Sequence, residues 1–196
     1  MAIKGSTGEV RPGTRWGYAV AVWGVLFAIP SFLWAAGGTF GAESTVAPEL
    51  VRLARDGVPW FLAVLWVTGF LKLFGAVIGL GLTRLRGRRT SRALVFCGGG
   101  AAVLLGWHGG LFLVHGILVE TGAASVDPAL AGLTRWYLYL WGPWFIAGGL
   151  AFATATARYL RRHPDHRDHR SARHRAALGA LGALLLSLAS TATGIG

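Results

Sequence analysis

The sequence predicts an all-α fold, an integral membrane helical bundle of four to five transmembrane helices in one compact domain. The first observation is composition: 54% of the residues are hydrophobic and only 14% are charged, whereas soluble domains usually carry about 25% charged residues. The second is that the charged residues form short clusters between long uncharged runs. Runs of about 18 apolar residues are long enough to cross a bilayer as helices.

Five apolar runs account for the predicted helices. The first four are long enough to span, and they cover residues 16–36, 59–83, 93–119 and 136–157. The fifth, residues 176–194, is less apolar because Gly, Ala, Ser and Thr dilute its leucines, so it is either a span or a membrane-associated tail. The predicted divisions are a tail (1–15), a four-span bundle (16–160), a basic His/Arg loop (161–175) and the last run (176–196).

Positive charge is distributed unequally between the two sides of this bundle. Fifteen Lys or Arg and three acids fall in the N-terminal tail and the 84–92 and 158–175 loops, against three Arg and five acids in the 37–58 and 120–135 loops. The positive-inside rule therefore predicts a cytoplasmic N-terminus, with the 37–58 and 120–135 loops outside. This topology and contact with the lipid bilayer explain the net charge of +11, so no nucleic-acid partner is expected.

The 37–58 loop contains a short amphipathic segment, APELVRLARDG. Pro48 suits the first position of a helix, and Gly57 suits the stop. The apolar residues between them share one helical face, which predicts a helix lying at the outer membrane surface. The alternative is a connecting helix with no function of its own.

Lys72 interrupts the apolar stretch VTGFLKLFGAVIG in the second run. At 1.5 Å per residue it lies roughly 16 to 20 Å from either interface, where a charged side chain costs about 2.5 to 3.5 kcal/mol. Thr68, Lys72, Gly75 and Gly79 share one helix side. A stripe of small and polar residues is predicted to face neighbouring helices, not lipid.

The partner of Lys72 is left open by the sequence, because no Asp or Glu lies inside any predicted span. Pro30 removes a helical hydrogen bond in the first run and frees the carbonyl of Leu26, which is one candidate. A hydroxyl, a histidine or a bound anion are the others. The amine is either neutral, paired or exposed to a water-filled cavity.

A line of titratable side chains follows the third run. His108 and His115 are seven residues apart on one helix face, and Glu120 follows at the outer end. Such a line can carry protons or ligand, and these three residues are the candidates for acid–base catalysis. The alternative is two neutral histidines satisfied by hydrogen bonds to neighbouring helices.

No cofactor and no metal are expected. Two histidines on one face of one helix do not make a bis-His haem site, and a catalytic zinc usually needs three protein ligands. The histidines of the 161–175 loop alternate with arginines, which repel cations. The single cysteine, Cys97, cannot form an internal disulfide and is interpreted as a packing residue.

The fourth run begins RWYLYLWGPWF. Pro143 interrupts its helical hydrogen bonds and frees the carbonyl of Tyr139. Tyr137, Tyr139 and Trp144 are therefore candidates to line an outward-facing cavity. The alternative is an aromatic belt at the membrane interface beside a proline kink.

Two segments, SFLWAAGGTFG (31–41) and YLWGPWFIAGG (139–149), resemble a family of small actinobacterial integral membrane proteins. That family is a domain of unknown function with four predicted spans. The resemblance covers about residues 16–160 and implies a four-helix core, without implying an activity. This chain departs from the family by its His/Arg loop and fifth run. The matching motif positions are Trp34, Gly37, Gly38, Gly142, Pro143 and Trp144.

The first functional hypothesis is a multi-pass protein of the bacterial inner membrane that binds a lipophilic or anionic small molecule in an outward-facing cavity between the second, third and fourth spans. Its predicted ligand-binding residues are Lys72, Thr68, His108, Tyr139 and Trp144. The second hypothesis is an enzyme acting on a membrane-soluble substrate, with His108 or His115 as acid or base. The third is an accessory subunit that pairs with a membrane-protein partner or forms a homo-oligomer.

Overall fold

The computed structural model describes residues 14–85, 87–162, 174, 176–182 and 184–185. All regular elements in these ranges are helices, as the composition predicted. Four of them are long and apolar enough to cross a membrane. The chain therefore has the architecture of a multi-pass membrane protein.

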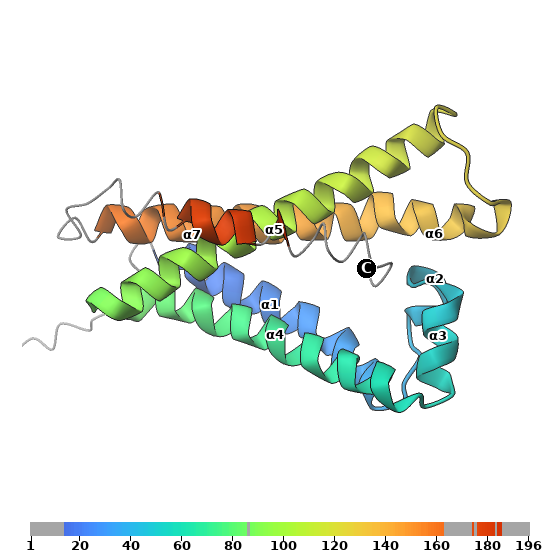
Figure 1. The fold of residues 1–196 in the computed structure, drawn as a ribbon, viewed down its shortest axis with the longest axis horizontal. Coiled ribbons are helices and arrows are strands. Elements are labelled where there is room, and N and C mark those ends of the chain that lie inside the picture. The colour runs from blue at the N-terminus through green and yellow to red at the C-terminus, as the bar shows by residue number, and fades with distance from the viewer. Residues whose placement is uncertain (1–13, 86, 163–173, 175, 183, 186–196) are drawn as a thin grey trace, which may run out of the picture.

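The four long helices form two antiparallel pairs, α1 with α4 and α5 with α7 (Figure 1). The pairs lie close together at the end where α4 leads into α5, and they diverge toward the other end. There α2 and α3 lie beside the ends of α1 and α4, and α2 also contacts α6. The bounds are α1 Arg15–Ala35, α2 Ala42–Thr45, α3 Pro48–Arg55, α4 Pro59–Arg84, α5 Arg88–Glu120, η1 Pro128–Leu130, α6 Ala131–Trp136, η2 Tyr137–Trp141 and α7 Gly142–Arg162.

Glycines bring the backbones of α1 and α4 together. A Cβ added to Gly79 would lie 2.8 Å from the carbonyl oxygen of Gly17, and one added to Gly24 would lie 3.0 Å from that of Lys72. A side chain at either position would force the helices apart, as at other membrane-helix contacts built on small residues. Gly75 faces α7 instead, where an added Cβ would lie 3.5 Å from Phe152. The predicted stripe of α4 therefore faces neighbouring helices.

A buried tyrosine fixes the turn between α4 and α5. The hydroxyl of Tyr159 donates a hydrogen bond to the carbonyl of Leu85 (3.1 Å) and lies 2.6 Å from the hydroxyl of Ser91. Tyr159 is fully buried, together with Val20 and Leu82. These residues hold the two helix pairs together at the end where they converge.

The third helix begins earlier than the sequence predicted. Residues 88–92 belong to α5 and not to a loop, so the connection shrinks to residues 85–87. The reason is burial on the other face of this arginine-rich stretch, where Ser91 is 3% exposed. A helix that buries Ser91, Leu94 and Val95 on one side leaves the arginines on the other.

The fourth run contains a π-helical turn before its main helix. Tyr137–Trp141 is π-helical, and the N–H of Gly142 bonds the carbonyl of Tyr137. Pro143 has no N–H to donate to Tyr139, so the regular ladder is broken here. The predicted interruption is thus realised as a π-bulge, a form often found at functional sites.

The described part of the last apolar run is helical and packs on α5. A Cβ added to Gly100 would lie 3.0 Å from the carbonyl oxygen of Gly179, and one added to Gly99 would lie 3.0 Å from the Cβ of Ala176. Residues 186–196 lie outside the described residues, so a fifth span stays a prediction. The N-terminal tail (1–13) and most of the His/Arg loop (163–173) also lie outside them.

Candidate functional site

Lys72 is partnered by two residues of α1. Its ammonium donates a hydrogen bond to the hydroxyl of Ser31 at 2.7 Å and lies 3.9 Å from the centroid of the Phe27 ring. Ser31 is only 2% exposed. The partner is therefore a hydroxyl and an aromatic face, and not the freed carbonyl of Leu26. Both contacts favour a charged amine in apolar surroundings.

The Phe27 ring belongs to an aromatic cluster that joins the two helix pairs. Its centroid lies 5.2 Å from that of Phe145, 6.1 Å from that of Trp141 and 6.5 Å from that of Trp144. Trp23 stacks on Trp144 at 5.9 Å and donates its indole N–H to the carbonyl of Trp144 at 3.0 Å. We refer to these five residues as the aromatic cluster.

His108 reaches the same cluster from α5. Its ring centroid lies 5.2 Å from that of Phe145 and 5.0 Å from that of Phe112, and the side chain is half-buried. Phe112 in turn stacks on Tyr137 at 4.8 Å. Lys72 and His108 therefore contact different rings of one cluster. Trp144, a third predicted site residue, is a member of it.

The other predicted residues lie apart from this cluster. Tyr139 is 68% exposed, and the side chain of His115 is exposed as well. Glu120 forms an exposed ion pair with Arg135, with 3.0 Å between Oε1 and Nε. The predicted line of titratable groups therefore does not run through the interior of the bundle.

The glycines beside the histidines explain this placement. A Cβ on Gly109 would lie 2.8 Å from the carbonyl oxygen of Gly142, and one on Gly116 would lie 2.6 Å from the Cβ of Leu138. Glycine thus occupies the face of α5 that meets η2 and α7. Each histidine precedes such a glycine by one position, about 100° around the helix.

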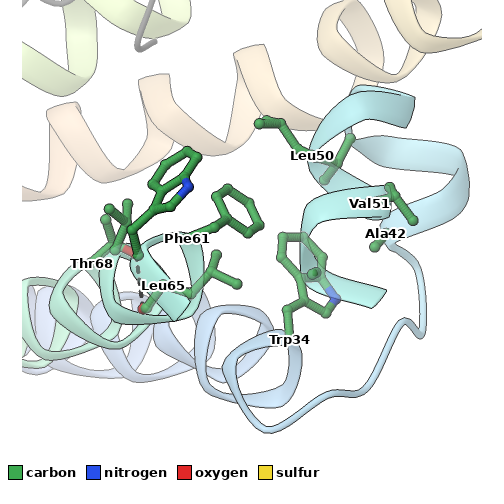
Figure 2. Close-up of a pocket in the computed structure, with 11 residues that line it drawn as sticks. Trp34, Ala42, Leu50, Val51, Phe61, Leu65 and Thr68 are labelled. Atoms are coloured by element: carbon green, nitrogen blue, oxygen red, sulfur yellow. Dashed lines mark hydrogen bonds between the residues drawn. The ribbon is translucent and has the colours of Figure 1, made fainter. Parts of the chain in front are cut away.

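A largely apolar pocket of about 480 Å³ lies between the α2–α3 segment and the ends of α1 and α4. Figure 2 shows Leu50 and Val51 facing the side of α4 that carries Phe61 and Leu65, with Thr68 at the end away from α2 and α3. The hydroxyl of Thr68 donates to the carbonyl of Leu65 at 3.0 Å. The lining residues are Trp34, Ala42, Val46, Leu50, Val51, Ala54, Trp60, Phe61, Val64, Leu65 and Thr68.

Of these lining residues, only Thr68 was singled out from the sequence as ligand-binding. The sequence feature that could have indicated the pocket was the amphipathic segment APELVRLARDG in the 37–58 loop. Its predicted helix is confirmed as α3, which begins at Pro48 and buries Val51 and Ala54. These two residues line the pocket, so the apolar face of α3 covers a hollow.

Residues 37–57, which we refer to as the α2–α3 cap, cover this pocket. Arg55 and Glu43 form an ion pair between its two helices. Gly37 (φ +90°) and Gly57 (φ +65°) stand at its two ends in the left-handed region that favours glycine. The indole N–H of Trp141 donates to the carbonyl of Thr45 at 2.9 Å and thereby ties the cap to η2.

In the part of the chain that the structure describes, no three His, Cys, Asp or Glu side chains lie together as metal ligands would. The expectation of no metal and no cofactor stays a prediction. The groups available to a ligand near the pocket are thus the Lys72 ammonium, hydroxyls and aromatic rings.

A model of a known protein family matches this chain. The family model described as "Protein of unknown function (DUF3995)" matches residues 24–152, which run from α1 into α7. The match includes Lys72, the aromatic cluster and the α2–α3 cap. Comparisons with curated proteins and with solved structures gave no match. The chain belongs to the DUF3995 family, whose function is unknown.

Proposed function

We propose that this protein binds a lipophilic small molecule with one anionic group in the pocket beneath the α2–α3 cap, with Lys72 as the electrostatic anchor. The observation that carries the proposal is the extent of the pocket. Its largely apolar lining ends at Thr68, one helical turn from Lys72 on the same face of α4.

The size and lining of the pocket suit such a ligand. A volume of about 480 Å³ falls within the range of about 300 to 1,000 Å³ found for small-molecule sites. Such sites combine apolar walls with a few polar groups that fix the orientation of the ligand. Here the walls are supplied by the cap and α4, and the polar group is Lys72.

The lysine side chain can reach the pocket. Four residues of α-helix rise about 6 Å, and the lysine stem is flexible. Exchanging the Ser31 hydroxyl for an anion would bring two opposite charges together in apolar surroundings, where their attraction is much stronger than in water. Trp144 lies against the Phe27 ring, and His108 lies one ring further away, against Phe145.

The proposal includes an orientation. The cap would face the outside of a bacterial inner membrane, with the N-terminus in the cytoplasm. The described charges support this, because arginines gather at the end where the helix pairs converge and acids at the cap end. The arginines at the converging end are Arg15, Arg84, Arg89, Arg92, Arg158, Arg161 and Arg162, whereas the other end carries three arginines (Arg52, Arg55 and Arg135) beside the five acids Glu43, Glu49, Asp56, Glu120 and Asp127.

The alternatives are acid–base catalysis by His108 or His115, and a role as an accessory subunit or homo-oligomer. Among the described residues, His115 is exposed and Glu120 pairs with Arg135, so these two side chains do not join His108 beside the aromatic cluster. The pocket is the observation that favours binding over both.

The test is native mass spectrometry on protein released from its own membrane, with added dodecanoate or its methyl ester as matched probes. The wild type should retain a bound species or take up dodecanoate in preference to the ester. Lys72→Met should lose this preference, and Leu71→Met should keep it, since Leu71 is 63% exposed at the same depth. A wild type that takes up neither probe and carries no bound species would overturn the proposal.

A further inference from the structure

We propose that Trp141 is a positioning residue that latches the α2–α3 cap to the second helix pair and so keeps the pocket closed. The role of this latch in keeping a ligand in the pocket rests on the proposed function. The latch itself is a property of the ligand-free protein and can be measured there.

The first argument is the hydrogen bond between Trp141 and Thr45. Its indole N–H reaches the carbonyl of a residue 96 positions earlier, at 2.9 Å. Thr45 is 8% exposed and its hydroxyl donates to the carbonyl of Gly41 at 2.6 Å, so the acceptor belongs to a buried helical turn that carries its own side-chain hydrogen bond. Among the hydrogen bonds recorded for the described residues, this is the one that joins the cap to η2 and α7.

The second argument is how the cap is connected elsewhere. Gly37 and Gly57, at the two ends of the cap, have open space around the position of an added Cβ. Near the first end, the indole N–H of Trp34 donates to the carbonyl of Phe40 at 3.0 Å and ties the start of the cap to α1. The ion pair of Arg55 with Glu43 joins α3 to α2. These contacts tie the cap to the first helix pair, and α2 is held to the second pair by its packing on α6 and by the Trp141 hydrogen bond. Loss of that bond should therefore loosen the cap where it meets the second pair.

The third argument is that the same indole also contacts the lysine site. The Trp141 ring lies 6.1 Å from Phe27, and the Phe27 ring carries the ammonium of Lys72 at 3.9 Å. Trp141 is the last residue of the π-helical turn, whose wide geometry redirects side chains relative to an α-helix. One side chain thus touches both the cap and the residue against which Lys72 packs.

The experiment is hydrogen–deuterium exchange of the full chain in nanodiscs without ligand, comparing the wild type with Trp141→Phe. The variant keeps an aromatic ring and removes the N–H. Amides of residues 42–55 should exchange about five-fold faster, the factor expected for one lost hydrogen bond. Amides of α5 should be unchanged, and the control Trp136→Phe, at a 42% exposed position in α6, should match the wild type. Equal exchange of the cap in wild type and Trp141→Phe overturns the proposal, as does equal acceleration of cap and α5, which marks a general structural role.

A second measurement keeps the proposal testable if Trp141→Phe does not fold. In the wild type, the indole N–H of Trp141 should exchange at the rate of the cap amides, because one opening exposes both. An indole N–H that exchanges many times faster than those amides overturns the latch. If dodecanoate never binds the wild type, the proposed function fails while the exchange data still decide the latch. If it binds, its dissociation should be faster in Trp141→Phe.

Discussion

The pairing of Lys72 with Ser31 gives the sharpest prediction about stability. A lysine charge at mid-membrane costs about 2.5 to 3.5 kcal/mol. A hydrogen bond from a charged donor returns about 1.5 to 3 kcal/mol, and a desolvated cation over an aromatic ring returns about 2 kcal/mol. The two contacts together return about 3.5 to 5 kcal/mol, which exceeds the cost by about 0 to 2.5 kcal/mol, so Lys72→Met should lower the free energy of unfolding by no more than about 2.5 kcal/mol.

Ser31→Ala should behave differently, because it removes the hydroxyl and leaves the ammonium. Ser31 is 2% exposed and its hydroxyl accepts from Lys72 at 2.7 Å, so water does not readily replace it. The loss should be about 1.5 to 3 kcal/mol in the wild type. In the Lys72→Met background the same substitution should be nearly neutral, since the donor is gone. The double-mutant cycle should therefore give a coupling of at least about 1.5 kcal/mol.

The assay is reversible unfolding in mixed micelles for the wild type, both single variants and the double variant. Ser125→Ala, at an exposed position between α5 and η1, is the control and should be neutral in both backgrounds. Neutral hydrogen bonds between membrane helices average about 0.6 kcal/mol. A coupling at or below that value would refute the reasoning, because the bond would then not be carrying a charge.

Three further predictions use the same unfolding assay. Gly79→Ala should cost about 1 to 3 kcal/mol, since its Cβ would press on the backbone of α1, whereas Gly110→Ala, with nothing within 4 Å, should stabilise by about 0.5 to 1 kcal/mol. Equal effects would contradict the close contact of α1 and α4. Tyr159→Phe should cost about 1 to 3 kcal/mol by removing buried hydrogen bonds at the α4–α5 turn. Arg135→Ala should cost less than about 1 kcal/mol, because its ion pair with Glu120 is exposed, and a larger loss would show that this pair holds α6 in place.

Much of the fold could be predicted because it depends on local properties. The length and apolarity of a run determine whether it crosses a membrane, so the four helices were found from the sequence. For most of the helix ends, the predicted and observed positions differ by only a few residues. The helix from Pro48 to Arg55 followed from a proline start and an apolar face. The early start of α5 was missed because it depends on Ser91 and Leu94 packing against other helices.

The site could be predicted only in part, because it depends on how helices rotate against each other. The cost of Lys72 identified it as a residue with a partner, but the choice between Ser31 and the Leu26 carbonyl depends on the glycine contacts of α1 and α4. Tyr139 was expected at a cavity and instead lies on the surface, because the π-helical turn changes which side chains face the bundle. The pocket combines residues of α1, α4 and the cap, and no local pattern indicates such a combination.

The pairing of neighbouring spans has a consequence for biogenesis. The four long helices form two helical hairpins, residues 15–84 and 88–162, each made of consecutive spans (Figure 1). Contacts between segments close in sequence form soonest, so each hairpin can close as it leaves the insertion machinery, before the other exists. The aromatic rings between α1 and α7 must meet last. The joining of the two hairpins therefore ends where Trp141 reaches the Phe27 ring, against which Lys72 already packs within the first hairpin.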